Sequence, residues 1–280
     1  MMAQDDPLPS PAPRHDGPIG VFDSGVGGLT VVHALRQALP DENIVYLGDT
    51  ARVPYGTRSG DVVRRYAKRC AQFLLDRGAK MLVIACNTAS AYALSDLQAA
   101  LNVPVLGVIE AGASLAASHC PQGKIGVLAT EGTVASLAYQ KSLGRLAPKA
   151  EVMAVACPMF VPLCEENLMA HRATRLLAQE YLHELMHWPA QAVVLGCTHY
   201  PLLTPLLVDL LGPDVRIIDS ASAVAQAVGR ALDETELRAP QNQEPGHRLA
   251  LYATDVTPRT KKIAVQFLQE ATATVERVDL

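Results

Sequence analysis

The sequence repeats itself, and this internal duplication constrains the fold more than any other feature. Segments of the first half resemble segments of the second half in the same order: PIGVFDSGVGG and KIGVLATEGTV, NIVYLGDTARVPYG and EVMAVACPMFVPLCE, MLVIACNTAS and AVVLGCTHYP, and VPVLGVIEAGASLA and VRIIDSASAVAQAV. One match between apolar segments would carry little weight, but several matches in register are difficult to attribute to chance. We therefore expect two similar units related by a pseudo-twofold axis.

Short apolar segments alternate with longer segments of helical periodicity. The apolar segments have the composition of parallel strands buried on both faces, and they lie at 19–22, 43–48, 81–86, 103–108, 124–129, 152–157, 192–197, 215–219 and 249–253. Helices are predicted between them, for example at 29–39, 59–78 and 173–188. Such an alternating order implies right-handed crossovers and a layered α/β architecture.

The duplication predicts two pseudo-symmetric, three-layer α/β lobes with mainly parallel sheets and an active site in the cleft between them. The first lobe is expected to comprise residues 17–112 plus 218–280, with a final strand and helix at 248–278 that return to complete it. The second lobe is expected to comprise residues 113–217. Residues 1–16 are predicted to be a disordered tail, because they are rich in proline and contain too little apolar surface to offset the entropy of ordering.

The composition argues against several classes of function. The net charge of −4 and the lack of a basic run give no basis for binding to nucleic acid or to a membrane surface. No apolar stretch reaches the roughly 18 residues of a transmembrane helix, and the acidic N-terminus does not resemble a secretory signal. Six cysteines without a CxxC pair indicate free thiols in the cytoplasm rather than disulfides or a structural zinc site.

Polar side chains follow several of the predicted strands. Ligands in open α/β sheets bind beyond the carboxyl ends of the strands. The residues expected at these ends are Asp23-Ser24, Cys86-Asn87-Thr88, Thr130 and Cys197-Thr198-His199. The duplication gives Cys86 and Cys197 equivalent positions, one in each lobe, so that two sulfur atoms would approach one ligand from opposite sides.

This arrangement suits the removal of a proton from one face of a carbon atom and the return of another proton to the opposite face. A thiol is adapted to both steps because its unperturbed pKa of about 8.5 lies near neutrality. One cysteine must start as a thiolate and the other as a thiol. Asp23 could assist Cys86, while His199, oriented by Glu165, could assist Cys197.

The glycine-rich segment at 25–28 follows Asp23-Ser24 and opens a predicted helix. Amide groups at a helix start can bind an anion such as a carboxylate, and glycine permits close approach of the backbone. The segment matches neither GxGxxG nor a Walker motif, so nucleotide binding does not follow.

In combination, these motifs resemble those of glutamate racemases, within the aspartate/glutamate racemase superfamily. The matching segments are GVFDSGVGGLTV (20–31), YLGDTARVPYG (46–56), ACNTAS (85–90), PVLGVIEAG (104–112), ACPMFVPLCEE (156–166), GCTHYPLL (196–203) and IDSA (218–221). The resemblance implies an isomerase that interconverts L- and D-glutamate by a two-cysteine mechanism without cofactor or metal. It further implies a cytoplasmic homodimer that supplies D-glutamate for peptidoglycan synthesis, cell wall biogenesis and cell shape.

By position, the resemblance implies that Cys86 and Cys197 are the catalytic acid/bases, and that Asp23, Glu165 and His199 support proton transfer. The substrate-binding residues that it implies are Asp23, Ser24, Tyr55, Gly56, Asn87, Thr88, Thr130, Thr198 and His199. By analogy with the family, Cys86 removes the α-proton of D-glutamate and Cys197 removes the α-proton of L-glutamate. The sequence departs from the family at Cys164, where an aliphatic residue is common; this thiol could pack or could be oxidisable.

Structural roles are the alternatives for several of these residues. Cys86 could be a buried cysteine at a strand end, Asp23 a helix cap, and Glu165 a first-turn carboxylate. His199 could be a core histidine or half of an incomplete Cys-x-His metal site. Tyr55 could contribute packing only.

Other functions are also compatible with the motifs. The enzyme could racemise another amino acid, such as aspartate. It could instead be a binding protein that has lost the chemistry, since some relatives inhibit DNA gyrase and the additional tail could contact a partner. Thiol redox chemistry is a further class, although neither cysteine has a resolving partner nearby in sequence.

Overall fold

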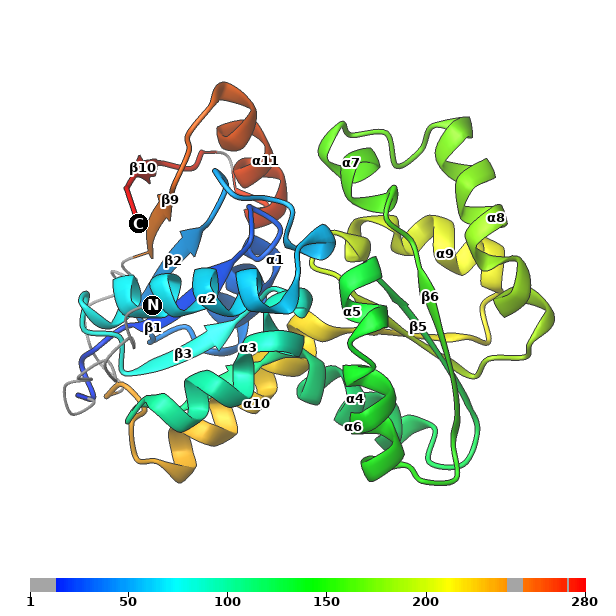
Figure 1. Cartoon of the computed structure of the whole chain (residues 1–280), viewed down its shortest axis with the longest axis horizontal. Coiled ribbons are helices and arrows are strands. Elements are labelled where there is room, and N and C mark those ends of the chain that lie inside the picture. Colours follow the sequence, from blue (N-terminus) through cyan, green and yellow to red (C-terminus); the bar gives the residue numbers. More distant parts are fainter. Residues whose placement is uncertain (1–13, 241–248, 271) are drawn as a thin grey trace.

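Two α/β lobes lie side by side in the computed structural model, which describes residues 14–240, 249–270 and 272–280 (Figure 1). The predicted tail at 1–16 therefore lies mostly outside the described residues. In the order of the sheet, the strands of the first lobe are β10 (Val275–Arg277), β9 (Leu249–Ala253), β2 (Ile44–Gly48), β1 (Ile19–Asp23), β3 (Met81–Ile84) and β4 (Val105–Gly107). Those of the second are β6 (Glu151–Ala156), β5 (Lys124–Ala129), β7 (Ala192–Gly196) and β8 (Arg216–Asp219).

Every strand pair in both sheets is parallel, which confirms the predicted fold class. The order β2-β1-β3-β4 in the first sheet is repeated as β6-β5-β7-β8 in the second, so the duplicated segments occupy equivalent places. The first sheet is extended by β9 and β10, which come from the C-terminal part of the chain. The strand β8 includes residue 217, the expected lobe boundary, and pairs with β7.

Helices cover both faces of each sheet. Those of the first lobe are α1 (Leu29–Ala38), α2 (Gly60–Leu75), α3 (Asn87–Ala100), α10 (Ser220–Glu234) and α11 (Pro258–Leu268), with the short 3₁₀ helix η1 (Tyr55–Thr57). Those of the second lobe are α5 (Glu131–Ala135), α6 (Ala138–Leu146), α7 (Phe160–Glu165), α8 (Arg172–His187) and α9 (Thr204–Leu211), with the 3₁₀ helix η2 (Tyr200–Leu203). The helix α4 (Val108–His119) packs against both α10 and α6 and so joins the lobes.

Successive side chains of each buried strand point to opposite faces of its sheet, and this alternation creates the layers. In β1, Val21 packs into the core shared with α1, α10 and α11, whereas the next residue, Phe22, packs into the core shared with α2 and α3. In the second lobe, Val194 faces the α4 and α6 side, while Leu195 faces the α7, α8 and α9 side. A strand that is covered on both faces must be apolar at consecutive positions, which is the pattern that these segments have.

Candidate functional site

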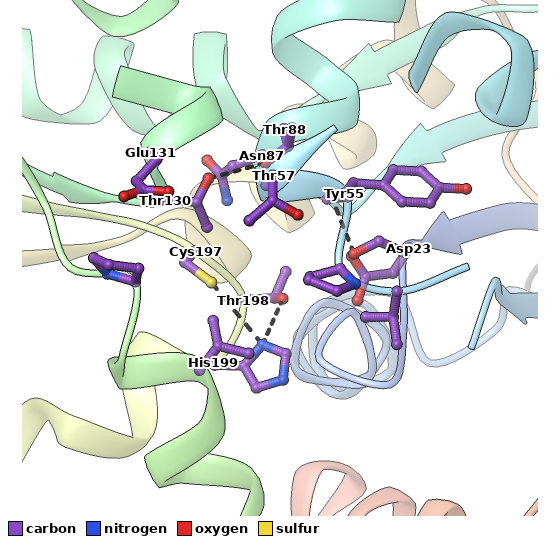
Figure 2. Close-up of a pocket in the computed structure, with 18 of the residues that line it drawn as sticks. Asp23, Tyr55, Thr57, Asn87, Thr88, Thr130, Glu131, Cys197, Thr198 and His199 are labelled. Atoms are coloured by element: carbon purple, nitrogen blue, oxygen red, sulfur yellow. Dashed lines mark hydrogen bonds between the residues drawn. The ribbon is translucent and has the colours of Figure 1, made fainter. Parts of the chain in front are cut away.

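A cavity of about 130 Å³ lies between the lobes, beyond the carboxyl ends of β1, β3, β5 and β7 (Figure 2). The sequence-predicted residues that line it are Asp23, Ser24, Tyr55, Gly56, Cys86, Asn87, Thr88, Thr130, Cys197, Thr198 and His199. Glu165 lies behind His199 rather than in the wall.

Cys86 caps the N-terminus of α3, directly after β3. Its Sγ accepts a hydrogen bond from the Ala89 amide at 3.4 Å and lies 3.6 Å from Ser24 Oγ, to which it donates. Burial, followed by the negative charge of Asp23, raises the pKa of the Cys86 thiol to about 12, although these two hydrogen bonds oppose the shift. Cys86 is therefore a thiol at neutral pH, and the ordinary thiol pKa assumed from sequence does not apply.

Cys197 follows β7 and faces a histidine–carboxylate pair. Its Sγ lies 3.9 Å from His199 Nδ1, and His199 Nε2 lies 3.2 Å from Glu165 Oε1. A carboxylate at Nε2 favours the tautomer that carries its proton there, which leaves Nδ1 as an acceptor facing the thiol. Burial is the main cause that holds the pKa of the Cys197 thiol well above its usual range. The amide of His199 opposes this shift, whereas the charge of Asp23 adds to it.

Asp23 combines the capping role with a place in the cavity wall. Its Oδ2 accepts a hydrogen bond from the Gly28 amide at 2.7 Å, whereas Oδ1 is buried without a hydrogen-bond partner among the described residues. Burial raises the pKa of the Asp23 carboxyl, although His199 and nearby amides oppose the shift. Because Asp23 occupies the Gly28 amide, that amide is not available to bind an anionic ligand.

The glycine at position 27 brings the lobes together. A Cβ atom on Gly27 would lie 2.5 Å from His199 Nδ1 and would also clash with the Thr198 hydroxyl. Thr30, one helical turn further on, donates to the Thr198 carbonyl at 3.2 Å. The glycine-rich segment of the first lobe therefore packs directly against the residues that follow Cys197, and glycine is required for this close approach.

Asn87 and Thr88 carry contacts across the cleft. The Tyr139 hydroxyl donates to Asn87 Oδ1 at 2.8 Å, which orients the amide, while Asn87 Nδ2 is buried without a hydrogen-bond partner among the described residues. Thr88 Oγ1 lies 3.0 Å from Thr130 Oγ1. The first lobe thus presents an unpaired donor at Asn87 and an unpaired acceptor at Asp23 in the wall of one cavity.

The hydroxyl of Tyr55 points away from the cavity (Figure 2). It donates to Asp49 Oδ2 at 2.5 Å, and the other oxygen of this fully buried carboxylate accepts from Arg52 and Thr254. Tyr55 therefore positions η1 through Asp49 and offers no hydroxyl to a ligand. Sequence reasoning missed Asp49, although it stands within the motif YLGDTARVPYG; it also missed the lining residues Thr57, Glu131, Pro158, Val161 and Pro162.

Cys164 is fully buried and donates to the His199 carbonyl at 3.4 Å. Burial, followed by the charge of Glu165, raises the pKa of this thiol to about 12. A thiol with these properties is unreactive, so the structure favours packing over the oxidisable thiol. Burial alone would raise the pKa of Glu165, but His199 and Arg259 outweigh it, and the pKa of this carboxyl is lowered.

In the described part of the chain, no three or more His, Cys, Asp or Glu side chains are grouped so as to hold a metal ion. None of the helices described is long and apolar enough to cross a membrane.

The profile of the Asp/Glu/Hydantoin racemase family matches residues 20–228. The chain belongs to this family. It is 47% identical to a glutamate racemase of Syntrophus aciditrophicus over 94% of this chain and 97% of the relative. Among solved structures, a glutamate racemase isoform of Bacillus anthracis superposes with a TM-score of 0.89 at 39% identity, covering 94% of this chain and 98% of the other.

A glutamate racemase of Francisella tularensis, solved in complex with D-glutamate, superposes with a TM-score of 0.87 at 37% identity, covering 95% of this chain and 98% of the other. Coverage near the full length of each relative means that the racemase fold is present as a whole in this chain. The protein is accordingly an enzyme of the racemase class, and its interlobe cavity is the candidate active site.

Proposed function

We propose that this racemase interconverts L- and D-glutamate, with Cys86 and Cys197 as the two acid/bases. The observation that carries the proposal is the meeting of two thiols from equivalent strand ends in the wall of one cavity. A racemase needs proton donors and acceptors on opposite faces of the α-carbon, and two lobes that contribute one thiol each supply them. Neither thiol requires a cofactor for this step.

The unpaired polar atoms of the cavity suggest how an amino acid binds. Asp23 Oδ1 is a buried acceptor that suits the α-ammonium group, and Asn87 Nδ2 is a buried donor that suits a carboxylate. Buried polar groups are costly unless they are paired, so a ligand that satisfies both is favoured.

Substrate binding also supplies what the thiols lack. Both are held protonated by burial and by the negative charge of Asp23. An α-ammonium group close to them stabilises a thiolate by Coulomb attraction in a site shielded from water. Cys197 can then transfer its proton to His199 Nδ1 and remove the α-proton of L-glutamate, while Cys86 protonates the opposite face; the reverse direction begins at Cys86.

The physiological part of the proposal rests on the resemblance to glutamate racemases. Such enzymes provide D-glutamate for peptidoglycan, so we assign this chain a cytoplasmic role in cell wall synthesis as a homodimer. We assign the first lobe to residues 17–112 plus 218–280 and the second lobe to residues 113–217.

Racemisation in D₂O tests the proposal. The enzyme is incubated with L-glutamate or L-aspartate, inversion is followed by circular dichroism, and α-deuterium is followed by NMR. We expect inversion of glutamate, with solvent deuterium in the newly formed enantiomer before it appears in the starting one. Inversion of aspartate without inversion of glutamate would reject the substrate assignment.

Single-cysteine variants test the roles of the thiols. Cys86→Ser should lose inversion, yet Cys197 should still exchange the α-proton of L-glutamate with solvent on one face. Cys120→Ser is the matched control, because this buried cysteine lies at the end of α4 and bonds only within the second lobe. A Cys86→Ser variant that inverts glutamate at the full rate would require a different mechanism.

A further inference from the structure

Arg259 bridges the two lobes on the side where α11 faces α7 (Figure 1). It is the second residue of α11, in the first lobe, and it pairs with two consecutive carboxylates at the end of α7, in the second lobe. Its Nη2 lies 3.2 Å from Glu165 Oε2, and its Nη1 lies 2.6 Å from Glu166 Oε1. One guanidinium group therefore contacts both carboxylates across the boundary between the lobes.

Apart from these two ion pairs, the space around Arg259 is open. Cavities of about 180 and 320 Å³ flank the side chain, and Glu165, Arg259 and Ile263 contribute to the walls of both. By contrast, the contacts of Thr88 with Thr130 and of Asn87 with Tyr139 across the cleft are mostly buried. The ion pairs of Arg259 thus form a discrete and solvent-accessible link between α7 and α11.

The same residue reaches the catalytic cavity through a continuous series of contacts. Arg259 holds Glu165 Oε2, while Glu165 Oε1 faces His199 Nε2. His199 Nδ1 in turn faces the Sγ of Cys197. Because each oxygen of the Glu165 carboxylate has a different partner, its orientation toward His199 depends on Arg259 as well as on α7.

We propose that Arg259 is a positioning residue that clasps the two lobes together and aligns Glu165 with His199 on the Cys197 side of the cavity. The inference rests on the proposed function for its kinetic consequences, but the clasp itself is a property of the fold. Arg259 lies beyond residues 20–228, where the family profile matches, so the match gives it no role.

The physical character of the link suits reversible closure. The Arg259 side chain is 51% exposed, and that of Glu166 is 55% exposed. Exposed ion pairs are weak individually and are screened by salt, so the lobes can separate at this point when substrate enters or product leaves. A planar guanidinium can engage two carboxylates at once, which the point charge of lysine does less well.

Two carboxyls of the site titrate on the acid limb of kcat/KM: Asp23, whose pKa is raised, and Glu165, whose pKa is lowered, so Glu165 governs the lower part of that limb. The titratable or charged groups around Glu165 are His199, Arg259 and Cys164, with Glu166, Lys262 and Asp255 in the adjoining crevices. Removing the positive charge of Arg259 raises the pKa of Glu165. The ionised form of Glu165 is then lost at higher pH than in the wild type, so this lower part of the acid limb of kcat/KM moves to higher pH.

Four variants separate the two parts of the proposal. Arg259→Gln should raise KM for glutamate about fivefold and lower kcat about tenfold, since both the clasp and the alignment are lost. Glu166→Gln removes one of the two ion pairs of the clasp and leaves Arg259 paired with Glu165, so it should raise KM about threefold without changing kcat or the acid limb. In Arg259→Lys, the acid limb should stay at the same pH as in the wild type, whereas kcat should be partly reduced. Lys261→Gln, the same charge change on the same helix, is the control and should change nothing.

Hydrogen–deuterium exchange gives a readout that does not depend on activity. Peptides that cover residues 158–168 should exchange about fivefold faster in Arg259→Gln than in the wild type, but should be unchanged in Lys261→Gln. Unchanged exchange in Arg259→Gln overturns the clasp, whether or not the enzyme acts on glutamate. An unmoved acid limb overturns the alignment of Glu165. If Arg259→Gln does not fold, Arg259→Lys and Glu166→Gln decide the same two points.

Discussion

The ionisation of Cys86 in the free enzyme gives a quantitative prediction. Burial and the charge of Asp23 raise the pKa of its thiol to about 12. Only the thiolate reacts with alkylating reagents, and its fraction at pH 8 is about one in 10⁴ for a pKa of about 12, against about a quarter for an ordinary thiol. Alkylation of Cys86 should therefore be about three orders of magnitude slower than that of an unperturbed cysteine.

Substituting Asp23 tests whether its charge, rather than limited access of the reagent, slows the alkylation of Cys86. Removing its negative charge lowers the pKa of Cys86, because repulsion between carboxylate and thiolate is relieved. A lower pKa increases the thiolate fraction at fixed pH, so Cys86 should be alkylated faster in Asp23→Asn than in the wild type at pH 8. The same variant should racemise glutamate more slowly, since the proposed partner of the ammonium group loses its charge.

The assay follows the Cys86 peptide by mass spectrometry after iodoacetamide treatment at pH 7 to 10. In the native enzyme, the rate should rise about tenfold per pH unit without a plateau, whereas in the urea-unfolded chain it should level off near pH 9. A native plateau near the pKa of an ordinary thiol would refute the reasoning. Slower alkylation of Asp23→Asn would refute the role given to the carboxylate.

Substitutions elsewhere test other parts of the structure. Gly27→Ala should abolish racemisation while leaving the far-UV circular dichroism unchanged, because the new methyl group displaces the His199 ring; full activity would contradict this close approach. Asn87→Ala should raise KM for glutamate by about tenfold, the effect of losing one hydrogen bond to a charged group, and an unchanged KM would remove Asn87 from the proposed binding site. Glu42→Gln leaves the fully buried Lys80 without its ion pair at 2.7 Å, and urea titration should show a loss of about 3–5 kcal/mol with kcat retained.

Much of the fold was predictable because the duplicated segments are apolar at consecutive positions. This pattern identified the strands, and the repeated order of segments implied the repeated order β2-β1-β3-β4 and β6-β5-β7-β8. The strand ends then indicated where polar residues gather. These inferences need only periodicity and the geometry of parallel sheets.

The orientation of individual groups was not predictable, because it depends on tertiary contacts. The sequence cannot indicate that Tyr55 turns its hydroxyl to Asp49, or that the two oxygens of Asp23 have different surroundings. It also gives no sign that Arg259 reaches Glu165 from 94 residues away. The upward shifts of the thiol pKa values likewise follow from burial, which only the assembled lobes determine.

The two halves of the site are equivalent in topology but not in chemistry. Cys86 is supported by the amides at the start of α3 and by Ser24, whereas Cys197 is supported by His199 and Glu165. The two enantiomers of a free amino acid have equal free energies, so kcat/KM must be the same in both directions for the wild type and for every variant. The unequal surroundings can therefore make kcat differ between the two directions only if KM differs by the same factor. The surroundings can, however, set which thiol is ionised first when substrate binds. The two halves of a duplicated fold can therefore diverge in this respect without altering the equilibrium between the two enantiomers.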